Sequence, residues 1–180
     1  MRLFVAIELP EEIKEYLADI QSKIKENLSK EDELRFVSKD QMHLTLKFLG
    51  EVQPDKVEKI NQLLGEASFK PFSPSLGGLG VFPNEEYIRV VWLGLSSEDK
   101  IISLQGEIDD KLKKLFPKER DFKPHLTLAR VKSIKGPGIF INNLKTVKIE
   151  NKLINLDSFK LVKSTLTQNG PIYEELQSFS

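Results

Sequence analysis

The chain has 180 residues, and its 27 basic side chains balance 27 acidic ones, which gives a formal net charge of zero and a sequence pI of about 6.8. This balance argues against a general polyanion binder, because non-specific affinity for nucleic acid comes mainly from excess positive charge. The hydrophobic content of 39% is that of a folded globular protein and excludes a disordered chain.

The sequence contains no cysteine and two histidines. It therefore has no disulfide scaffold, thiolate nucleophile or cysteine-based metal centre, and we expect no metal site and no cofactor. No apolar stretch approaches the ~20 residues that span a bilayer, and the apolar run at the N-terminus is too short for a signal peptide. We predict a cytoplasmic protein without a membrane partner, and we take it to be a monomer.

The first half of the chain alternates between strand and helix patterns. Brief apolar runs predict strands, and apolar residues that recur every three or four positions predict helices. The predicted elements of this half are strands at 3–7, 34–37 and 43–48 and helices at 11–28 and 57–67.

The second half begins after a segment rich in proline and glycine at 72–83, which reads as a strand with loops and as the join between the halves. The same apolar patterns then predict further elements. These are strands at 87–93, 125–129, 153–162 and 172–179, a helix at 98–115, and a loop with room for a short helix at 132–146.

The order strand, helix, strand occurs twice, and such repeats fix the architecture. The two copies are 3–7, 11–28 and 43–48, and 87–93, 98–115 and 125–129. We therefore predict an α+β fold in which a single bilobal domain, residues 1–180, has lobes at about 1–70 and 71–180. Two antiparallel sheets would face each other across a central groove, with the helices outside.

Both histidines lie in identical His-Leu-Thr-Leu strings, which begin at His43 and His125. One short string is a weak signal, but the same string around both histidines is hard to attribute to chance. Alternation puts His43 and Thr45 on one face of their strand, and His125 and Thr127 on one face of the other. The two lobes would bring two imidazoles and two hydroxyls together at one site.

This set of groups suits metal-free acid–base chemistry on a phosphate. A neutral imidazole can take a proton from a nucleophile while an imidazolium gives one to a leaving oxygen, both near neutral pH. Threonine hydroxyls can donate hydrogen bonds to the non-bridging oxygens as charge develops. The alternative is that each histidine has a purely structural role, packed in its strand and satisfied by a hydrogen bond. The duplication of the string argues strongly against this alternative.

The strings RFVSKDQMHLTLKFLG and FKPHLTLAR resemble the two-histidine phosphoesterase superfamily. The start MRLFVAIELP and the tail FKLVKSTLTQNGPIYEEL resemble its bacterial and archaeal RNA 2′,3′-cyclic phosphodiesterases, also called 2′-5′ RNA ligases. The resemblance implies hydrolysis of an RNA 2′,3′-cyclic phosphate to a 2′-phosphate, without a nucleotide cofactor. It also implies reversible joining of tRNA halves through a 2′-5′ linkage.

The resemblance matches His43, Thr45, His125 and Thr127 to the catalytic positions of the family. It implies that His125 activates water and that His43 protonates the departing 3′ oxygen. Because the site is nearly symmetric, the reverse assignment of the two histidines stays open.

Five residues after each histidine stand Phe48 and Arg130, which resemble substrate-contacting positions of the family. Phe48 could stack on a base, and Arg130 could grip a phosphate with two hydrogen bonds. Strict alternation places both on the face opposite the histidines, so they reach the groove only if the strands end or bend there. Otherwise Phe48 would be a core residue and Arg130 a solvated charge. Weaker groove candidates are Phe36, Lys47, Lys123, Lys163 and Ser164.

Two other functions remain open from the sequence. The groove could capture an RNA end or a nucleotide without turnover, as a binding module. Alternatively the enzyme could act on a small cyclic nucleotide or an ADP-ribose cyclic phosphate, for which a chain without an extended basic face is unsurprising.

Overall fold

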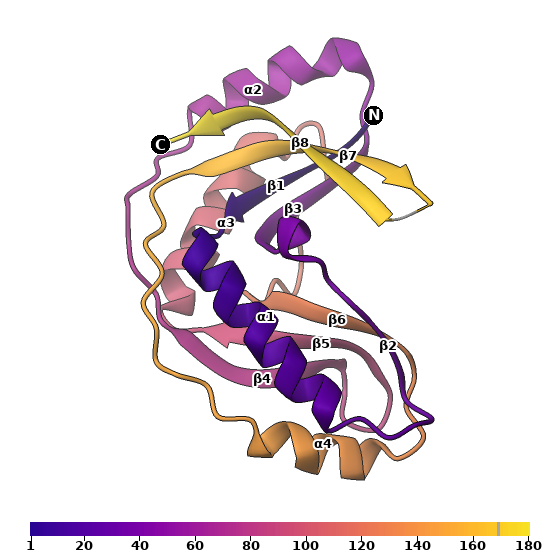
Figure 1. Ribbon diagram of the computed structural model, residues 1–180. Coiled ribbons are helices and arrows are strands. Elements are labelled where there is room, and N and C mark those ends of the chain that lie inside the picture. The colour runs from indigo at the N-terminus through magenta and orange to yellow at the C-terminus, as the bar shows by residue number, and fades with distance from the viewer. Residues whose placement is uncertain (169) are drawn as a thin grey trace.

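The computed structural model describes residues 1–168 and 170–180 and has an α+β fold (Figure 1). Its strands are β1 (Arg2–Glu8), β2 (Glu33–Phe36), β3 (His43–Glu51), β4 (Leu76–Pro83), β5 (Ile88–Leu95), β6 (Leu126–Ser133), β7 (Phe159–Thr167) and β8 (Gly170–Phe179). Its helices are α1 (Glu11–Glu26), α2 (Val57–Gly65), α3 (Glu98–Leu112) and α4 (Pro137–Thr146). Among the described residues, no helix is long and apolar enough to cross a membrane.

The strands form one antiparallel sheet of eight strands, in the order β4-β5-β6-β3-β1-β7-β8, with β2 also paired to β6. The prediction of two separate sheets is therefore wrong. The two halves of the sheet join where Leu44 of β3 pairs with Leu126 of β6. This join is short because β2 occupies the same edge of β6 from Ala129 onward. The sheet is thus continuous at the two His-Leu-Thr-Leu strings and splayed on either side of them.

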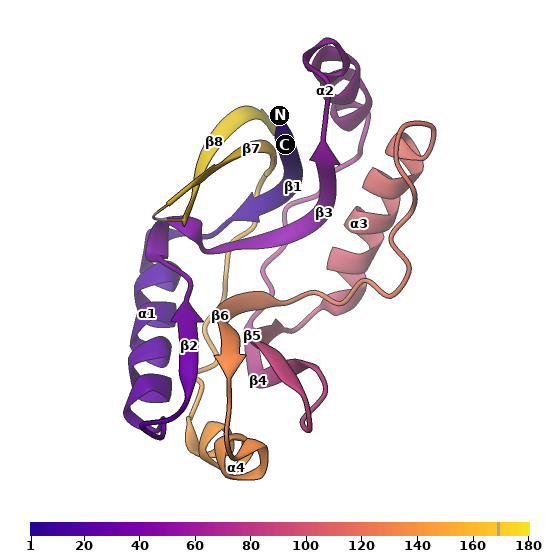
Figure 2. The ribbon, with the colours of Figure 1, turned by 90° about the vertical axis from the view of Figure 1, so that its right-hand side faces the viewer.

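Chain order and spatial order differ between the repeats. Helix α1 follows β1 in the chain but contacts β6, whereas α3 follows β5 but contacts β3 and α2. Figure 2 shows this exchange, with α1 beside β2 and α3 beside β3. The pairing of β7 with β1 also brings the C-terminal hairpin back to the first strand. Each half of the sheet is therefore covered by the helix of the other repeat.

The core lies between the sheet and these exchanged helices. The apolar stripe of α1 is Ile13, Leu17, Ile20 and Ile24, and that of α3 is Ile101, Leu104, Ile108 and Leu112. All eight side chains are buried, as their helical spacing predicts. Each helix also buries a polar residue directly after the third member of its stripe, Gln21 after Ile20 in α1 and Asp109 after Ile108 in α3.

The predicted strand at 153–162 differs from the structure, because β7 begins only at Phe159. The preceding residues alternate between exposed Leu153 and buried Ile154 and Leu156, which imitates a strand in the sequence. They instead make isolated bridges to Ser75 and Phe72, in the segment before β4.

Candidate active site

The two His-Leu-Thr-Leu strands line a groove of about 570 Å³. His43 and Thr45 from β3 face it, as do Thr127 from β6 and His125 directly before that strand, while the intervening leucines are buried. The pairing of Leu44 with Leu126 fixes this arrangement, because flanking residues on both strands must then project to the opposite face. Among the described residues, no group of three or more histidine or acidic side chains could hold a metal ion together.

Both histidines are held in the same tautomer by a backbone carbonyl. Nδ1 of His43 lies 2.8 Å from the carbonyl oxygen of Gln41, and Nδ1 of His125 lies 2.7 Å from that of Lys123. A carbonyl only accepts, so each Nδ1 carries the hydrogen and each neutral ring has its lone pair on Nε2. In His43, this Nε2 accepts a hydrogen bond of 2.9 Å from the Thr45 hydroxyl. Nε2 is therefore the nitrogen that can exchange a proton in both rings.

His43 is the more enclosed histidine. Its ring centroid lies 4.9 Å from that of Phe4 and 5.3 Å from that of Tyr173. Burial lowers the pKa of His43 from 6.5 to about 4, with a smaller contribution from the charge of Lys14, although the hydrogen bond to Gln41 opposes this. His43 is therefore neutral at pH 7 in the ligand-free groove.

His125 has an aromatic wall of a different kind. Its ring centroid lies 5.0 Å from that of Phe82 and 6.3 Å from that of Trp92. The ammonium of Lys123 lies 4.6 Å from the centroid of the Trp92 ring. Burial lowers the pKa of His125, opposed by the hydrogen bond to the Lys123 carbonyl. Both imidazoles are thus poised as neutral bases before a ligand binds.

A β-bulge follows the histidine and threonine in each strand. The pairing of β3 with β1 skips Leu46, and the pairing of β6 with β5 skips Leu128. An extra residue reverses the alternation of the side chains beyond it. Phe48 and Arg130, which strict alternation would place on the far face, therefore line the groove with the histidines. In β3 the apolar alternation continues from Leu46 to Phe48 and hides the bulge, whereas in β6 the apolar positions shift from Leu126 and Leu128 to Ala129 and Val131.

The bulge in β6 is supported from behind by Gln21 of α1. The Gln21 side-chain amide donates hydrogen bonds of 2.8 Å to the carbonyl oxygens of Leu128 and Val37. The first of these is the bulged residue, and the second follows β2. Gln21 is 5% exposed, so these two bonds are shielded from water. One buried amide thus ties the helix to both strands beneath Arg130.

The bulge in β3 is supported by a buried ion pair. Lys47 is 2% exposed and pairs with Asp109 of α3, while also donating to the Pro117 carbonyl. Asp109 accepts further hydrogen bonds from the Gln105 side chain and the Glu119 backbone N–H. Lys47 therefore points away from the groove, and its candidacy as a groove residue is wrong. The ion pair joins the His43 strand to the segment that leads to His125.

The other weaker candidates have different positions. Phe36 and Ser164 line the groove. Lys163 pairs with Glu174 of β8 at 2.8 Å and is not among the groove-lining residues.

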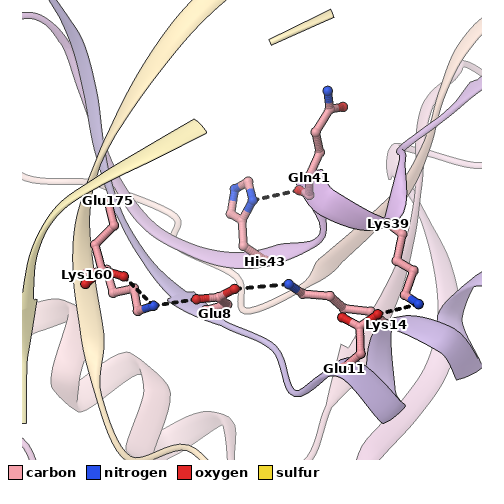
Figure 3. A network of polar contacts seen from close by, with 8 residues as sticks. All are labelled: Glu8, Glu11, Lys14, Lys39, Gln41, His43, Lys160 and Glu175. Atoms are coloured by element: carbon pink, nitrogen blue, oxygen red, sulfur yellow. Dashed lines mark hydrogen bonds and ion pairs between the residues drawn. The ribbon is translucent and has the colours of Figure 1, made fainter. Parts of the chain in front are cut away.

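A second pocket of about 250 Å³ adjoins the groove at His43. Figure 3 shows a row of alternating charges along it, from Glu175 through Lys160 and Glu8 to Lys14. The hydrogen bond from Lys160 holds the pKa of Glu8 below its usual value. This row fixes the ammonium of Lys14 on the side of the site where its charge disfavours protonation of His43.

Comparison with known proteins agrees with this geometry. The family model described as LigT like Phosphoesterase matches the chain twice, at residues 7–92 and 93–173. The chain belongs to this family. The double match corresponds to the strand–helix–strand repeat, and the family resemblance stated from the sequence is confirmed.

Relatives and solved structures of the family cover nearly the whole chain. It is 42% identical to the RNA 2′,3′-cyclic phosphodiesterase of Methanocaldococcus jannaschii, over 99% of this chain and 100% of that one. It is 39% identical to the protein of the same name from Archaeoglobus fulgidus, over 99% of both chains. The crystal structure of E. coli LigT complexed with 3′-AMP matches with a TM-score of 0.77 and 29% identity, over 98% of this chain and 95% of that one.

Proposed function

We propose that this protein hydrolyses the 2′,3′-cyclic phosphate at an RNA end to a 2′-phosphate and a free 3′-hydroxyl, by acid–base catalysis without a metal ion. The observation that carries the proposal is the groove itself, where two imidazoles of the same tautomer and two threonine hydroxyls converge. The relatives at 42% and 39% identity are named RNA 2′,3′-cyclic phosphodiesterases, which supports this choice of substrate.

The reaction needs one proton acceptor and one proton donor. Nε2 of His125 takes a proton from water as the water oxygen bonds to phosphorus, and Nε2 of His43 gives a proton to O3′ as the P–O3′ bond breaks. Both rings are neutral in the empty groove, but the negative charge of a bound phosphate raises the pKa of each, which allows one to be charged at pH 7. Exchange with solvent then restores the starting protonation.

The threonines act on the phosphate oxygens. The Thr45 hydroxyl donates to His43 Nε2 in the ligand-free groove, and it must turn away once that nitrogen carries a proton. A non-bridging phosphate oxygen is the partner that then becomes available. Thr127 holds the equivalent place beside His125 and donates to the second non-bridging oxygen. Both bonds strengthen as negative charge grows in the transition state.

Phe48 and Arg130 bind the rest of the terminal nucleotide. Phe48 is 59% exposed in the groove, which suits stacking on a base, and the Arg130 guanidinium can donate two parallel hydrogen bonds to phosphate. Solved structures of E. coli LigT are described as complexes with 3′-AMP, ATP and NADP⁺, which supports nucleotide binding in this groove.

The same pair of histidines would serve RNA ligation. If a ribose 5′-hydroxyl attacks in place of water, the O5′–P bond forms, the P–O3′ bond breaks and a 2′-5′ linkage results. The proton transfers are identical, and the reverse reaction is possible because one P–O ester bond forms for each one that breaks. Broken tRNA halves, with a cyclic phosphate on one and a 5′-hydroxyl on the other, are the substrates we propose for this reaction.

The test is to incubate the protein in EDTA with an oligonucleotide that ends in a 2′,3′-cyclic phosphate, alongside a His43→Ala, His125→Ala double variant. Nuclease digestion and chromatography against 2′- and 3′-phosphate standards identify the product. A 2′-phosphate made by the wild type alone supports the proposal. Tight binding without product would favour a binding module, and activity that EDTA abolishes would overturn the metal-free mechanism.

A further inference from the structure

The groove concentrates positive charge although the chain as a whole has a net charge of zero. Of the five arginines in the sequence, Arg2, Arg35 and Arg130 line the groove. Among the residues that the structure describes, no aspartate, glutamate or lysine lines it. The net charge of the whole chain is zero, so this local excess is balanced by acidic residues elsewhere. A groove of this kind attracts anions although the protein as a whole does not.

Two of these arginines stand directly opposite each other. Arg35 of β2 pairs with Arg130 of β6 in the antiparallel register, so both side chains project from the same face of the sheet. Like charges at opposed positions destabilise a sheet. Across the described residues, lysines and the N-terminal amine make the ion pairs, and neither Arg35 nor Arg130 takes part in one. The arrangement is therefore one that a bound anion would stabilise.

The Arg35 guanidinium extends across the groove toward β8. A Cβ atom placed on Gly170 would lie 3.0 Å from Nη2 of Arg35 and 3.2 Å from Nε2 of Gln41. Gln41 in turn donates to the Pro171 carbonyl at 2.7 Å. The absence of a side chain at Gly170 thus leaves room for the Arg35 guanidinium and the Gln41 amide in this part of the groove.

We propose that Arg35, together with Arg130, binds the phosphodiester that links the terminal nucleotide to the one before it. This deepens the proposed function and rests on it. Arg130 follows Thr127 along β6, and Arg35 lies directly opposite Arg130 on β2, at the edge of β6 that β3 also occupies, so both guanidiniums line the groove beside the histidines. A phosphodiester 5′ of the terminal nucleoside can contact both. A nucleoside 2′,3′-cyclic phosphate with a free 5′-hydroxyl has no phosphate for Arg35. The protein therefore selects the end of an RNA chain over a cyclic nucleoside phosphate that lacks a 5′-phosphate.

The test compares three substrates that differ only in what lies 5′ of the terminal nucleoside: a cyclic mononucleotide with a 5′-hydroxyl, the same with a 5′-phosphate, and a dinucleotide ending in the cyclic phosphate. We expect kcat/KM for the dinucleotide to exceed that for the first by about tenfold or more, mainly through KM. Arg35→Gln should lower kcat/KM for the dinucleotide by more than kcat/KM for the 5′-hydroxyl mononucleotide, so that the ratio of the two falls toward one. The 5′-phosphorylated mononucleotide should recover most of this advantage, because its phosphate occupies the same position. A dinucleotide that reacts no better than the 5′-hydroxyl mononucleotide would overturn the subsite.

Two controls separate the subsite from general charge and from folding. Arg89→Gln changes an exposed arginine that neighbours Val90 on β5 and does not line the groove, and it should leave the preference intact. Arg35→Lys keeps the charge but loses the paired hydrogen bonds, so it should recover only part of the advantage. The slope of log affinity against log salt should fall by about 0.7 in Arg35→Gln, as for one lost phosphate contact to a single strand.

A binding measurement keeps the inference independent of turnover. Calorimetry compares a dinucleotide that ends in a 2′-phosphate with the matching nucleoside 2′-phosphate. If the wild type does not hydrolyse the cyclic ends but binds the dinucleotide more tightly through Arg35, the proposed reaction fails and the phosphodiester subsite stands. If both ligands bind equally, or if Arg35→Gln keeps the preference while its thermal unfolding matches wild type, the subsite is overturned.

Discussion

Strands β3 and β6 carry the same string and the same bulge, yet they differ at the next position on the groove face. In β3 the bulge at Leu46 presents Phe48, and in β6 the bulge at Leu128 presents Arg130. The shared part supplies two equivalent proton-transfer groups. The part that differs supplies an aromatic ring on one side and a cation on the other. The comparison indicates a symmetric reaction centre that holds an asymmetric ligand, with the nucleobase toward β3 and the phosphate toward β6.

The supports behind the two bulges also differ. An ion pair between Lys47 and Asp109 holds β3, whereas the neutral amide of Gln21 holds β6. Asp109 lies on α3 and Gln21 on α1, and each of these helices belongs to the other repeat than the strand it supports. Each helix therefore stabilises the backbone geometry of the strand in the other repeat. The same backbone shape can therefore be stabilised by a charged or by a neutral buried group, with different costs when each is removed.

Removing either of the paired histidines should have the largest effect on activity. His43→Ala and His125→Ala should each lower the rate of cyclic phosphate hydrolysis by ~10²–10⁴-fold, because each deletes one proton transfer. The double variant should be little slower than the slower single variant, since acid and base act as a unit. Single-turnover rates at saturating protein measure this. Losses that multiply in the double variant would show that the histidines act separately.

Breaking the ion pair behind β3 should cost the most stability. Lys47→Ala leaves the Asp109 carboxylate buried without its cation, which should lower the free energy of unfolding by about 3–5 kcal/mol. Urea denaturation measures the change. The matched control is Lys47→Met with Asp109→Leu, which removes both charges and should recover most of the stability. A single variant as stable as wild type would mean that the pair is not a support.

Removing the support behind β6 should cost less. Gln21→Ala deletes two buried hydrogen bonds to carbonyl oxygens, and we expect a loss of about 1–3 kcal/mol in the free energy of unfolding. Because the bulge sets the direction of Arg130, KM for an RNA end should also rise while kcat changes little. An unchanged KM in a clearly destabilised variant would separate the bulge from substrate binding.

The different roles of Phe48 and Arg130 should appear in how the salt dependence of RNA binding changes when each side chain is replaced. Arg130→Gln should weaken binding of an RNA end by about tenfold and reduce its salt dependence, because a phosphate contact is lost. Phe48→Ala should weaken binding by about fivefold, the lower end of the range for a stacked base, with the salt dependence unchanged. Titrations at several salt concentrations decide this. Equal salt slopes in the two variants would contradict the division of roles.

Much of the fold and the site could be predicted from residue patterns. The helices α1 and α3 and the strands β1 and β3 follow their apolar spacing closely. The face shared by His43 and Thr45 follows from alternation alone. The continuous sheet could not be predicted, because it depends on the single pair Leu44–Leu126 between segments far apart in the chain.

The groove position of Phe48 and Arg130 could not be predicted either. It depends on two bulges. A bulge forms through pairing with a neighbouring strand and is stabilised by buried groups behind it, such as Gln21 behind β6. The local pattern of β3 does not contain that information, and in β6 only the shift of the apolar positions to Ala129 and Val131 indicates it. The buried lysine shows the same limit, since Lys47 reads as a groove cation until its partner on α3 is known.

The most direct test of the paired-histidine mechanism is kcat/KM for a cyclic phosphate end as a function of pH. The rate should fall at low pH as the base becomes protonated and at high pH as the acid loses its proton. The optimum should lie below 6.5, because burial lowers the pKa of both rings in the free protein. His43→Ala and His125→Ala should each abolish one limb of the bell, and not the same one. A bell that survives in either variant, or the loss of the same limb in both, would contradict the account.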